Sequence, residues 1–508
     1  MHNRIPFPFT AHVLITCLIG LLGLGANDVL SEPRTQRVFF YVSENGSDRL
    51  GSGSEQRPWA TLAHACKQVS TSGSVIQLQP GNYSETRPCL LVKGVSILGG
   101  GREKTIVRSR LKDWLIYAVS EKVESGNQEI SSFAIDGLNR SLEHGITVQR
   151  RHHVDIKSMA FRDIEATAIQ VTGDGGNEKS PPRTYVQGIN ISNNSFTNCA
   201  KDYQTWSGGC VEIGQLDGSL IFGNQIEEDK GYGIKQVGGG WFKRTKIYGN
   251  KIRVPDHDAL WGSDITIELW NVSDDCEVFR NITSGWVSLG YGTKGGGKYS
   301  VRVYDNEIRI ENSENTKEAI ELVGVSDAEI FRNSIEGAKF GVAMWSGASS
   351  RNNLIHHNVI ANRADGEGVR IHRGENNKIY NNTFHHLSKA LGMYPTPTDI
   401  LNTEFRNNLV IDTQYGVIPD GDEAGIYNTV MVKNNFFNVA KSFEDWGYRK
   451  ATVLITASSS FNPGLRNEGQ NPYYPVSALS AVVDAGMDVG LPYCGKAPDI
   501  GAYEWCGE

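Results

Sequence analysis

An asparagine recurs in the chain every 24 to 31 residues, each time after a short apolar stretch. It stands in segments such as IFGNQI, IYGNKI and IFRNSI, whose alternating apolar residues indicate short strands. The repeated positions are Asn194, Asn224, Asn250, Asn281, Asn306, Asn333, Asn358, Asn382, Asn408 and Asn435. A period in the twenties is typical of solenoids, in which each coil packs only on its neighbours.

The repeated residue type also suggests how one coil joins the next. Asparagine tolerates left-handed backbone geometry, so we expect it to turn a corner between two strands. Stacked asparagine side chains can form a hydrogen-bonded ladder along the solenoid. A leucine-rich repeat is excluded, because the LxxLxL spacing is missing and no helical stretch recurs. The sequence therefore predicts an all-β, parallel β-helix solenoid, whose core grows with chain length across the 508 residues.

The N-terminus has the features of a secretory signal. Arg4 supplies positive charge, residues 13–24 are mostly apolar, and Ala26 suits cleavage. The apolar run is short for a membrane span, although an uncleaved anchor is the alternative. We expect a signal peptide at residues 1–26, no membrane span in the mature chain, and a secreted or cell-surface location.

The cysteines fit an oxidising compartment. Without Cys17 in the signal peptide, seven remain, and six of these lie in close pairs: Cys66 with Cys89, Cys199 with Cys210, and Cys494 with Cys506. We expect disulfides in these pairs, with Cys276 buried and free.

Charge and motifs exclude several function classes. The formal net charge is −7, which argues against a nucleic-acid partner. The chain has no Walker motif, no dinucleotide-binding fingerprint and no paired CxxC zinc pattern.

A second strand in each coil, upstream of the asparagine, can be aligned by pairs of inward apolar residues such as Ile267 and Leu269. The residue between each pair points outward. This outward row reads Thr147, Gln170, Glu212, Lys235, Glu268, Ser288, Glu321, Ala343 and Arg370. The row therefore gathers three acids, one lysine and one arginine on one face.

The next outward column contains Trp270, Trp345 and His372, and Arg373 follows directly. Exposed tryptophans suit the apolar faces of sugar rings, so the two columns predict a surface that binds an extracellular polysaccharide. The same residues are also compatible with a purely structural role. The charges could form only a surface ion ladder, and the tryptophans could pack beneath loops at residues 173–183, 255–262 or 293–298.

Three segments resemble a known group of proteins. FYVSENGSD (40–48), RPWATLAHA (57–65) and IQLQPGNYSE (76–85) look like the opening of pectate-lyase-like right-handed parallel β-helix proteins, and APDIGAYEW (497–505) is similar to a terminal segment common in that group. The resemblance implies a capping helix at ATLAHA and a single β-helix domain over 27–508. Within it we expect the N-terminal cap and first coils at 36–100, regular coils at 140–440 and a C-terminal capping segment at 441–508.

Strand spacing favours one reaction. Glu268 and Glu321 are separated by one coil, so their Cα atoms should lie roughly 10 Å apart. Inverting glycosidases hold two carboxylates about 6.5–9.5 Å apart, which flexible side chains here can reach. Glu212 lies one coil beyond Lys235, and we expect Lys235 to keep both neighbouring acids ionised. Hydrolysis with Glu268, Glu321, Glu212 and Lys235 as catalytic candidates requires no cofactor.

Two alternative functions remain open. A uronate polysaccharide lyase would use Lys235 as its base, Arg370 or Arg373 to hold a sugar carboxylate, and calcium bound by Glu212 and Glu268. No motif in the chain matches the calcium or catalytic signatures of pectate or alginate lyases. A non-catalytic, glycan-binding or adhesive solenoid would use the charges and tryptophans for recognition alone.

Overall fold

The computed structural model describes residues 37–200, 208–228, 231–254, 264–310, 318–420, 425–444, 451–466 and 472–507. Residues 37–508 form one compact unit. The predicted signal peptide and the segment 255–262 lie outside the described residues. Within the described part of the chain, no helix is both long and apolar enough to cross a bilayer.

A short helix closes the N-terminal end of the fold, as the sequence predicts. Helix α1 (Leu62–Gln68) begins after Thr61, whose hydroxyl accepts a hydrogen bond from the His64 amide. Leu62 and Cys66 of α1 are buried, and a disulfide joins Cys66 to Cys89. The N-terminal strands are β1 (Val38–Val42), β2 (Ser74–Leu78), β3 (Gly81–Glu85), β4 (Cys89–Leu90), β5 (Ser96–Leu98) and β6 (Thr105–Ser109).

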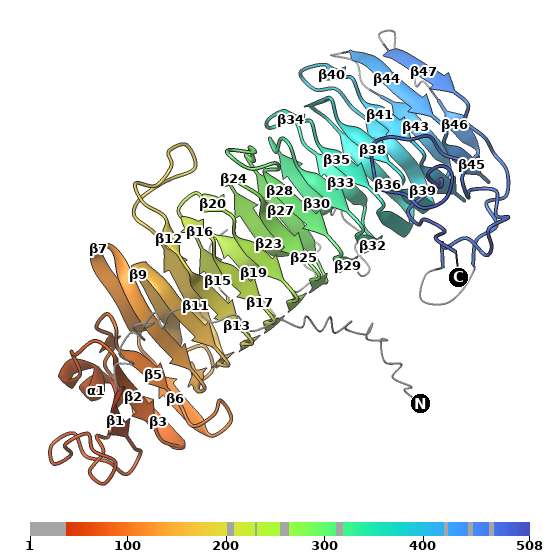
Figure 1. The fold of residues 1–508 in the computed structure, drawn as a ribbon. Helices are drawn as coiled ribbons and strands as arrows, with labels where there is room; N and C mark the ends of the chain where they lie inside the picture. Colours follow the sequence, from red (N-terminus) through yellow and green to blue (C-terminus); the bar gives the residue numbers. More distant parts are fainter. Residues whose placement is uncertain are drawn as a thin grey trace, which may run out of the picture. The chain divides into compact units, whose positions relative to one another are not determined.

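The rest of the unit consists of coils stacked in chain order from β7 to β47, and every paired strand runs parallel to its neighbour (Figure 1). Each regular coil contributes one strand to each of three stacks. The first stack contains β11 (Ile164–Thr172), β15 (Gly209–Ile213), β19 (Tyr232–Gln236), β23 (Ile265–Trp270), β27 (Trp286–Gly290), β30 (Glu318–Val323), β33 (Phe340–Met344), β43 (Tyr415–Pro419) and β46 (Lys441–Phe443).

The second stack contains β13 (Ile189–Ser192), β17 (Leu220–Phe222), β21 (Lys246–Tyr248), β25 (Cys276–Phe279), β28 (Val301–Tyr304), β31 (Glu329–Phe331), β35 (Leu354–His356), β38 (Lys378–Tyr380), β41 (Glu404–Arg406), β44 (Ile426–Val432) and β47 (Ala451–Thr456). The third contains β8 (Ala134–Asp136), β10 (Ala160–Arg162), β14 (Ser195–Thr197), β18 (Gln225–Glu227), β22 (Lys251–Arg253), β26 (Ile282–Thr283), β29 (Glu307–Arg309), β32 (Ser334–Glu336), β42 (Leu409–Ile411) and β45 (Asn435–Phe437).

Long strands continue from one stack into the next, and short strands form smaller stacks at a corner. The long strands are β7 (Trp114–Ser131), β9 (Leu142–Lys157), β36 (Val359–Ile371) and β39 (Thr383–Met393). The short strands are β12 (Val186–Gln187), β16 (Leu216–Asp217), β20 (Phe242–Lys243), β24 (Val272–Ser273), β34 (Ser350–Arg351), β37 (Gly374–Glu375) and β40 (Ile400–Leu401). Inward side chains of all three main stacks form one continuous apolar core.

The predicted asparagine ladder is present at the corner between the second and third stacks. The side-chain oxygen of Asn306, for example, accepts hydrogen bonds from the backbone and side-chain N–H groups of Asn281, each at 3.0 Å. The Asn306 side chain in turn donates to Asn333 and to the Val278 carbonyl. The same pattern runs from Asn194 to Asn408, so nine of the ten predicted positions are confirmed.

Two details of that prediction are wrong. The last ladder position is Asn434, which accepts from Asn408, and Asn435 instead begins β45. The left-handed residue at each corner is also not the ladder asparagine but the residue before it, for example Arg332 (φ 51°) before Asn333. The ladder asparagine therefore satisfies buried backbone groups, while its predecessor makes the turn.

The disulfide prediction is confirmed for two pairs and wrong for one. Cys494 and Cys506 are joined with a Cα–Cα distance of 5.1 Å, and Cys66 is joined to Cys89. Cys199 and Cys210 are both free and buried, and their thiols contact each other. Burial raises the pKa of the Cys210 thiol, and Cys199 raises it further, so the thiol form is favoured there.

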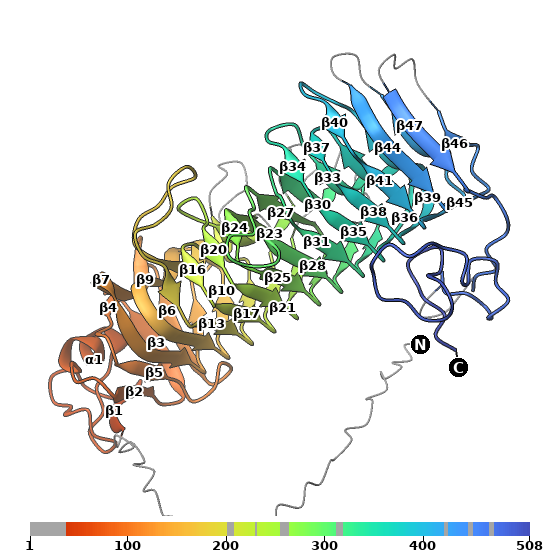
Figure 2. The ribbon, with the colours of Figure 1, turned by 45° about the horizontal axis from the view of Figure 1, so that its top comes forward.

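The C-terminal segment differs from a simple cap. Strands β46 and β47 continue the coils beyond residue 440, where the regular repeat was expected to end. Residues 472–507 pack against the flank of earlier coils (Figure 2): Asn381 donates a hydrogen bond to the Asp499 carbonyl, and Ile500 packs with Leu409.

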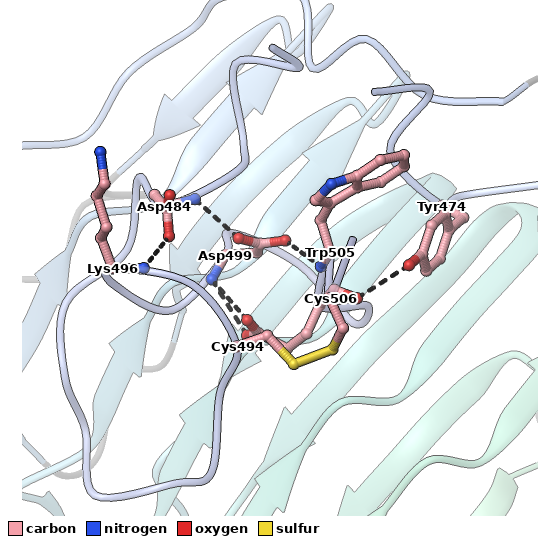
Figure 3. The surroundings of a disulfide bond; sticks show 8 residues. Tyr474, Asp484, Cys494, Lys496, Asp499, Trp505 and Cys506 are labelled. Atoms are coloured by element: carbon pink, nitrogen blue, oxygen red, sulfur yellow. Dashed lines mark hydrogen bonds between the residues drawn. A yellow bond between two sulfur atoms is a disulfide. The ribbon is translucent and has the colours of Figure 1, made fainter. Parts of the chain in front are cut away.

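The C-terminal segment is held by its own contacts (Figure 3). The disulfide between Cys494 and Cys506 closes a loop, and both carboxyl oxygens of Asp499 accept backbone hydrogen bonds, from Asp484 and Trp505.

Candidate functional site

The outward row predicted from the sequence is confirmed by the pairing of strands in the first stack, where its members lie opposite one another on consecutive coils. Gln170 pairs with Glu212, and Glu212 with Lys235. Further along, Glu268 pairs with Ser288 and Ser288 with Glu321. Ala343 then follows Glu321, and Arg370 follows Ala343. The row arises because each outward residue lies between two inward apolar residues of its strand, so stacking of the coils fixes the order.

A cavity of about 550 Å³ opens over the centre of this row. Five predicted site residues line it: Glu212, Lys235, Glu268, Trp270 and Glu321. Glu178 also lines the cavity, so the predicted loop 173–183 supplies part of its wall. That loop is held in place by hydrogen bonds from Trp241 to the Asn177 carbonyl and from Asn271 to the Glu178 carbonyl.

Lys235 and Glu268 form a buried ion pair in the cavity floor. The Lys235 Nζ atom lies 3.0 Å from Glu268 Oε2 and 4.3 Å from the centre of the Tyr232 ring. Burial raises the pKa of Glu268, whereas Lys235 lowers it. Burial outweighs the ion pair, so the pKa of Glu268 is raised, whereas the ion pair with Lys235 alone would lower it. Glu212 accepts a hydrogen bond from Gln170 at 2.8 Å.

Glu321 has the environment of a carboxylic acid rather than a carboxylate. It is only 3% exposed, and the Ser288 hydroxyl donates to its Oε2 atom at 2.6 Å. Burial raises the pKa of Glu321 to about 7, the Ser288 hydrogen bond opposes the rise, and Glu268 adds to it. At neutral pH the Glu321 carboxyl therefore holds its proton in about half of the molecules, whereas the neighbouring Glu268 is paired with Lys235.

Sequence reasoning missed one further buried acid, Glu318. Glu318 begins β30 and is 1% exposed, and burial raises its pKa to about 8, with further contributions from Glu321 and Asp264. Glu318 was missed because it lies two residues before Ile320, and the alternation along a strand places both residues on the inward face, where only apolar side chains were sought. An acid at an inward position of an otherwise apolar strand is the signal that could have identified it.

Trp270 lines the cavity, and its ring also packs against residues of the next coil. Its ring lies over Gly290 of the next coil, where a Cβ atom would come within 3.0 Å of the indole, and it contacts the edge of Tyr291. The space that Gly290 leaves is thus filled by Trp270 rather than kept open for a ligand. The indole remains partly exposed beside Val323 in the cavity wall.

The other predicted binding residues lie outside the cavity, one coil further along for Trp345 and two for Arg370 and His372. Trp345 stacks on His372, and His372 on Tyr394, with ring centres 4.9 and 5.5 Å apart. Arg370 donates to Glu367 and to His372 Nε2. Burial lowers the pKa of His372 to about 4, and Arg370 lowers it further, so the imidazole is neutral at neutral pH.

This second cluster includes three residues that the sequence did not reveal: Glu367, Lys389 and Tyr394. One oxygen of Glu367 accepts from Arg370, Lys389 and Tyr394. These side chains form most of their hydrogen bonds with one another, which is typical of a structural polar network. Arg373 does not join it and is half-buried at the adjacent corner, where its carbonyl accepts from Ser350.

Calcium does not fit between Glu212 and Glu268. The Lys235 ammonium occupies the side of Glu268 that would face the ion, and a cation there would repel Ca²⁺. No cluster of three or more His, Cys, Asp or Glu residues suited to a metal ion occurs among the residues that the structure describes.

Comparisons with known proteins agree with this fold. A family model described as "Right handed beta helix region" matches residues 266–437, and one described as "Protein of unknown function (DUF1565)" matches residues 44–257. No curated protein matches the chain.

Several solved structures match the chain at low identity and low TM-score. The A-module of the mannuronan C-5 epimerase AlgE6 from Azotobacter vinelandii is 14% identical, with a TM-score of 0.35, over 79% of this chain and 93% of that chain. A PL6-family polysaccharide lyase from Pseudopedobacter saltans is 12% identical, with a TM-score of 0.44, over 82% and 94%. PfbA, a surface adhesin of Streptococcus pneumoniae, is 12% identical, with a TM-score of 0.37, over 75% and 86%.

The parallel coils, the α1 cap and the match of residues 266–437 to a right-handed β-helix model together show that the chain folds as a right-handed parallel β-helix.

Proposed function

We propose that the protein is a secreted glycoside hydrolase that cleaves a polysaccharide in the cavity over Glu268 and Glu321. The observation that carries the proposal is the pair of buried carboxyl groups with different environments in one open cavity. Glu321 is protonated up to about pH 7, which suits a general acid, and Glu268 is paired with Lys235, which favours the ionised form needed of a general base.

The register fits an inverting mechanism. Glu268 and Glu321 are two strand spacings apart, so their Cα atoms lie about 10 Å from each other. A separation of about 6.5–9.5 Å between the carboxyl groups leaves room for a water molecule beside the sugar. Glu321 would protonate the leaving oxygen, Glu268 would take a proton from that water, and Trp270 would contact a sugar ring.

Cavity charge favours a neutral glycan over a uronate. Four glutamates and one lysine line the cavity, so its potential is negative and would repel a chain of sugar carboxylates. Lys235 is also poorly placed as the base of a lyase, because its ammonium group is held in an ion pair with Glu268 at 3.0 Å and not turned toward a substrate alone. The two disulfides fit an extracellular location for such an enzyme.

A panel of polysaccharides tests the proposal. We expect new reducing ends from at least one neutral polysaccharide such as a xylan, glucan, mannan or galactan, with no ultraviolet absorbance from an unsaturated uronate. Absorbance released from pectate or alginate would instead support elimination. Binding with no new reducing ends on any substrate would support a non-catalytic glycan-binding solenoid.

The pH profile should report the two carboxyl groups. Because Glu321 must be protonated, kcat/KM should fall about tenfold per pH unit above about pH 7, where Glu321 loses its proton. Because Glu268 must be ionised, kcat/KM should also fall on the acid side, below the raised pKa of Glu268. Initial rates between pH 3 and 10 on the cleaved glycan measure both limbs, and a rate that continues to rise above pH 8 would contradict Glu321 as the acid.

A further inference from the structure

Ser288 occupies the row position between the two proposed catalytic carboxyl groups. It pairs with Glu268 on the preceding coil and with Glu321 on the following coil, and all three residues line the cavity. The serine is 3% exposed. The coil between the two carboxyl groups therefore places one side-chain polar atom, Ser288 Oγ, in this part of the row.

The hydrogen of the Ser288 hydroxyl has one acceptor among the described residues. Ser288 Oγ lies 2.6 Å from Glu321 Oε2, and this contact is buried. If Glu321 carried its proton on Oε2, that proton would point at Ser288 Oγ, and the Ser288 hydrogen would be buried without an acceptor. A buried donor without a partner destabilises the protein, so the geometry favours donation from Ser288 to Oε2.

Donation from Ser288 decides which oxygen of Glu321 carries the acid proton. In a protonated carboxyl group, the oxygen that accepts a hydrogen bond is the carbonyl oxygen, so the proton belongs on Oε1. Oε1 has no hydrogen bond with a described residue, whereas Oε2 is occupied by Ser288. Because Glu321 lines the cavity, its proton is then on the oxygen that is left for a ligand.

The other titratable groups near Glu321 act on it through their charge rather than through a hydrogen bond. They are Glu178, Glu212, Lys235 and Glu268 around the cavity, Asp264 before β23, Glu318 on β30, and Arg370 two coils further along. Glu268 is paired with Lys235, and its charge raises the pKa of Glu321. Within the described part of the chain, Ser288 is the one side chain that donates a hydrogen bond to Glu321.

We propose that Ser288 is a positioning residue for the acid of the reaction: its hydroxyl keeps Glu321 Oε2 as the accepting oxygen and so presents the acid proton on Oε1 to the leaving oxygen of the glycan. This role rests on the proposed hydrolysis. The Oε1 proton moves to the leaving oxygen as the glycosidic C–O bond breaks, while the water oxygen bonds to the sugar and gives a proton to Glu268. The Glu321 carboxylate that remains keeps the Ser288 hydrogen bond, which stabilises its charge.

The same hydrogen bond has an effect that a purely structural serine would not have. Because it stabilises the ionised carboxyl, it lowers the pKa of Glu321 against the effect of burial. Removal of the hydroxyl should therefore raise this pKa and move the alkaline limb of kcat/KM to higher pH.

Ser288→Ala tests this role on the glycan that the parent protein cleaves. We expect kcat at the maximum of its pH profile to fall about tenfold, because the acid proton loses its fixed orientation. The alkaline limb of kcat/KM should move up by about 0.5–1 pH unit. Ser288→Thr keeps the hydroxyl and should return both values to near those of the parent.

Thr147→Val is the matched control, because it removes a buried hydroxyl from the same row. Thr147 lies four coils before Glu268, outside the cavity, and its hydroxyl has no hydrogen-bond partner among the described residues. This variant should change neither kcat nor the alkaline limb. A loss of kcat in Ser288→Ala with an unmoved limb would mean that the serine only maintains the structure, and a parent-like kcat and limb would also overturn its role.

Carboxyl NMR of protein with isotopically labelled glutamate separates this proposal from hydrolysis itself. The Glu321 signal is the one missing in Glu321→Gln, and its titration midpoint should be higher in Ser288→Ala than in the parent and unchanged in Thr147→Val. An unchanged midpoint in Ser288→Ala would overturn the role of Ser288. A parent protein that cleaves nothing on the polysaccharide panel would overturn hydrolysis, and the midpoint would then still show whether Ser288 controls Glu321.

Discussion

Exchanging Glu321 for glutamine is expected to lower kcat about a thousandfold on the glycan that the parent protein cleaves. Glutamine keeps the size of the side chain and can still accept the hydrogen bond from Ser288, but it cannot give a proton to the leaving oxygen. General acid–base groups typically contribute about 10²–10⁴-fold to a rate. Glycan binding should change little, because the exchange leaves Trp270 and the cavity walls in place.

Glu268→Gln should cause a loss of similar size, since it removes the proposed base. Glu212→Gln is the matched control in the same row: Glu212 also lines the cavity, but its carboxylate is held by Gln170 and by the Gly209 amide. We expect Glu212→Gln to keep kcat within about tenfold of the parent. If Glu321→Gln and Glu268→Gln both retained parent activity, the row would be an ion ladder, and any catalytic site would lie elsewhere.

Replacing a single ladder asparagine should destabilise the fold strongly. Asn306→Ala leaves the buried backbone N–H of Asn281, one side-chain N–H of Asn281 and the Val278 carbonyl without their partners. Each unsatisfied buried group costs about 1–3 kcal/mol, so we expect the free energy of unfolding to fall by about 3 kcal/mol or more. Chemical denaturation followed by circular dichroism measures the change.

Asn352, an exposed asparagine outside the buried ladder, provides the control. Asn376 donates a hydrogen bond to the side chain of Asn352, whose φ is 55° and whose surroundings are open to solvent. Asn352→Gly removes that contact while glycine tolerates the left-handed backbone, so the free energy of unfolding should change by less than about 1 kcal/mol. Equal destabilisation by both variants would show that burial of the ladder is not what makes it stabilising.

Sequence reasoning predicted the fold and the row well, because both follow from strict geometric rules. Period-two alternation fixes which side chains of a strand face outward, and the coil repeat fixes which strands are neighbours. The misplacement of the last ladder position arose where two asparagines are adjacent. The spacing from the inward residue resolves it, since Asn408 lies three residues after Phe405 and Asn434 lies three after Met431.

The remaining errors concern contacts that no periodic rule determines. Cys199 and Cys210 are close in sequence and in contact, yet proximity alone did not establish a bond between them. The direction of the Glu268 pKa depends on how deeply the carboxyl is buried, which the row pattern does not reveal. The repeat also gave no indication that residues 472–507 would pack against the flank of the coils.

The most direct test of hydrolysis by Glu268 and Glu321 is proton NMR of the reaction with the cleaved glycan, recorded from the first minutes. We predict that the new reducing end first appears with the anomeric configuration opposite to that of the broken bond, with no alkene proton. A first product of retained configuration would contradict the inverting pair, and an alkene proton from an unsaturated sugar would contradict hydrolysis itself.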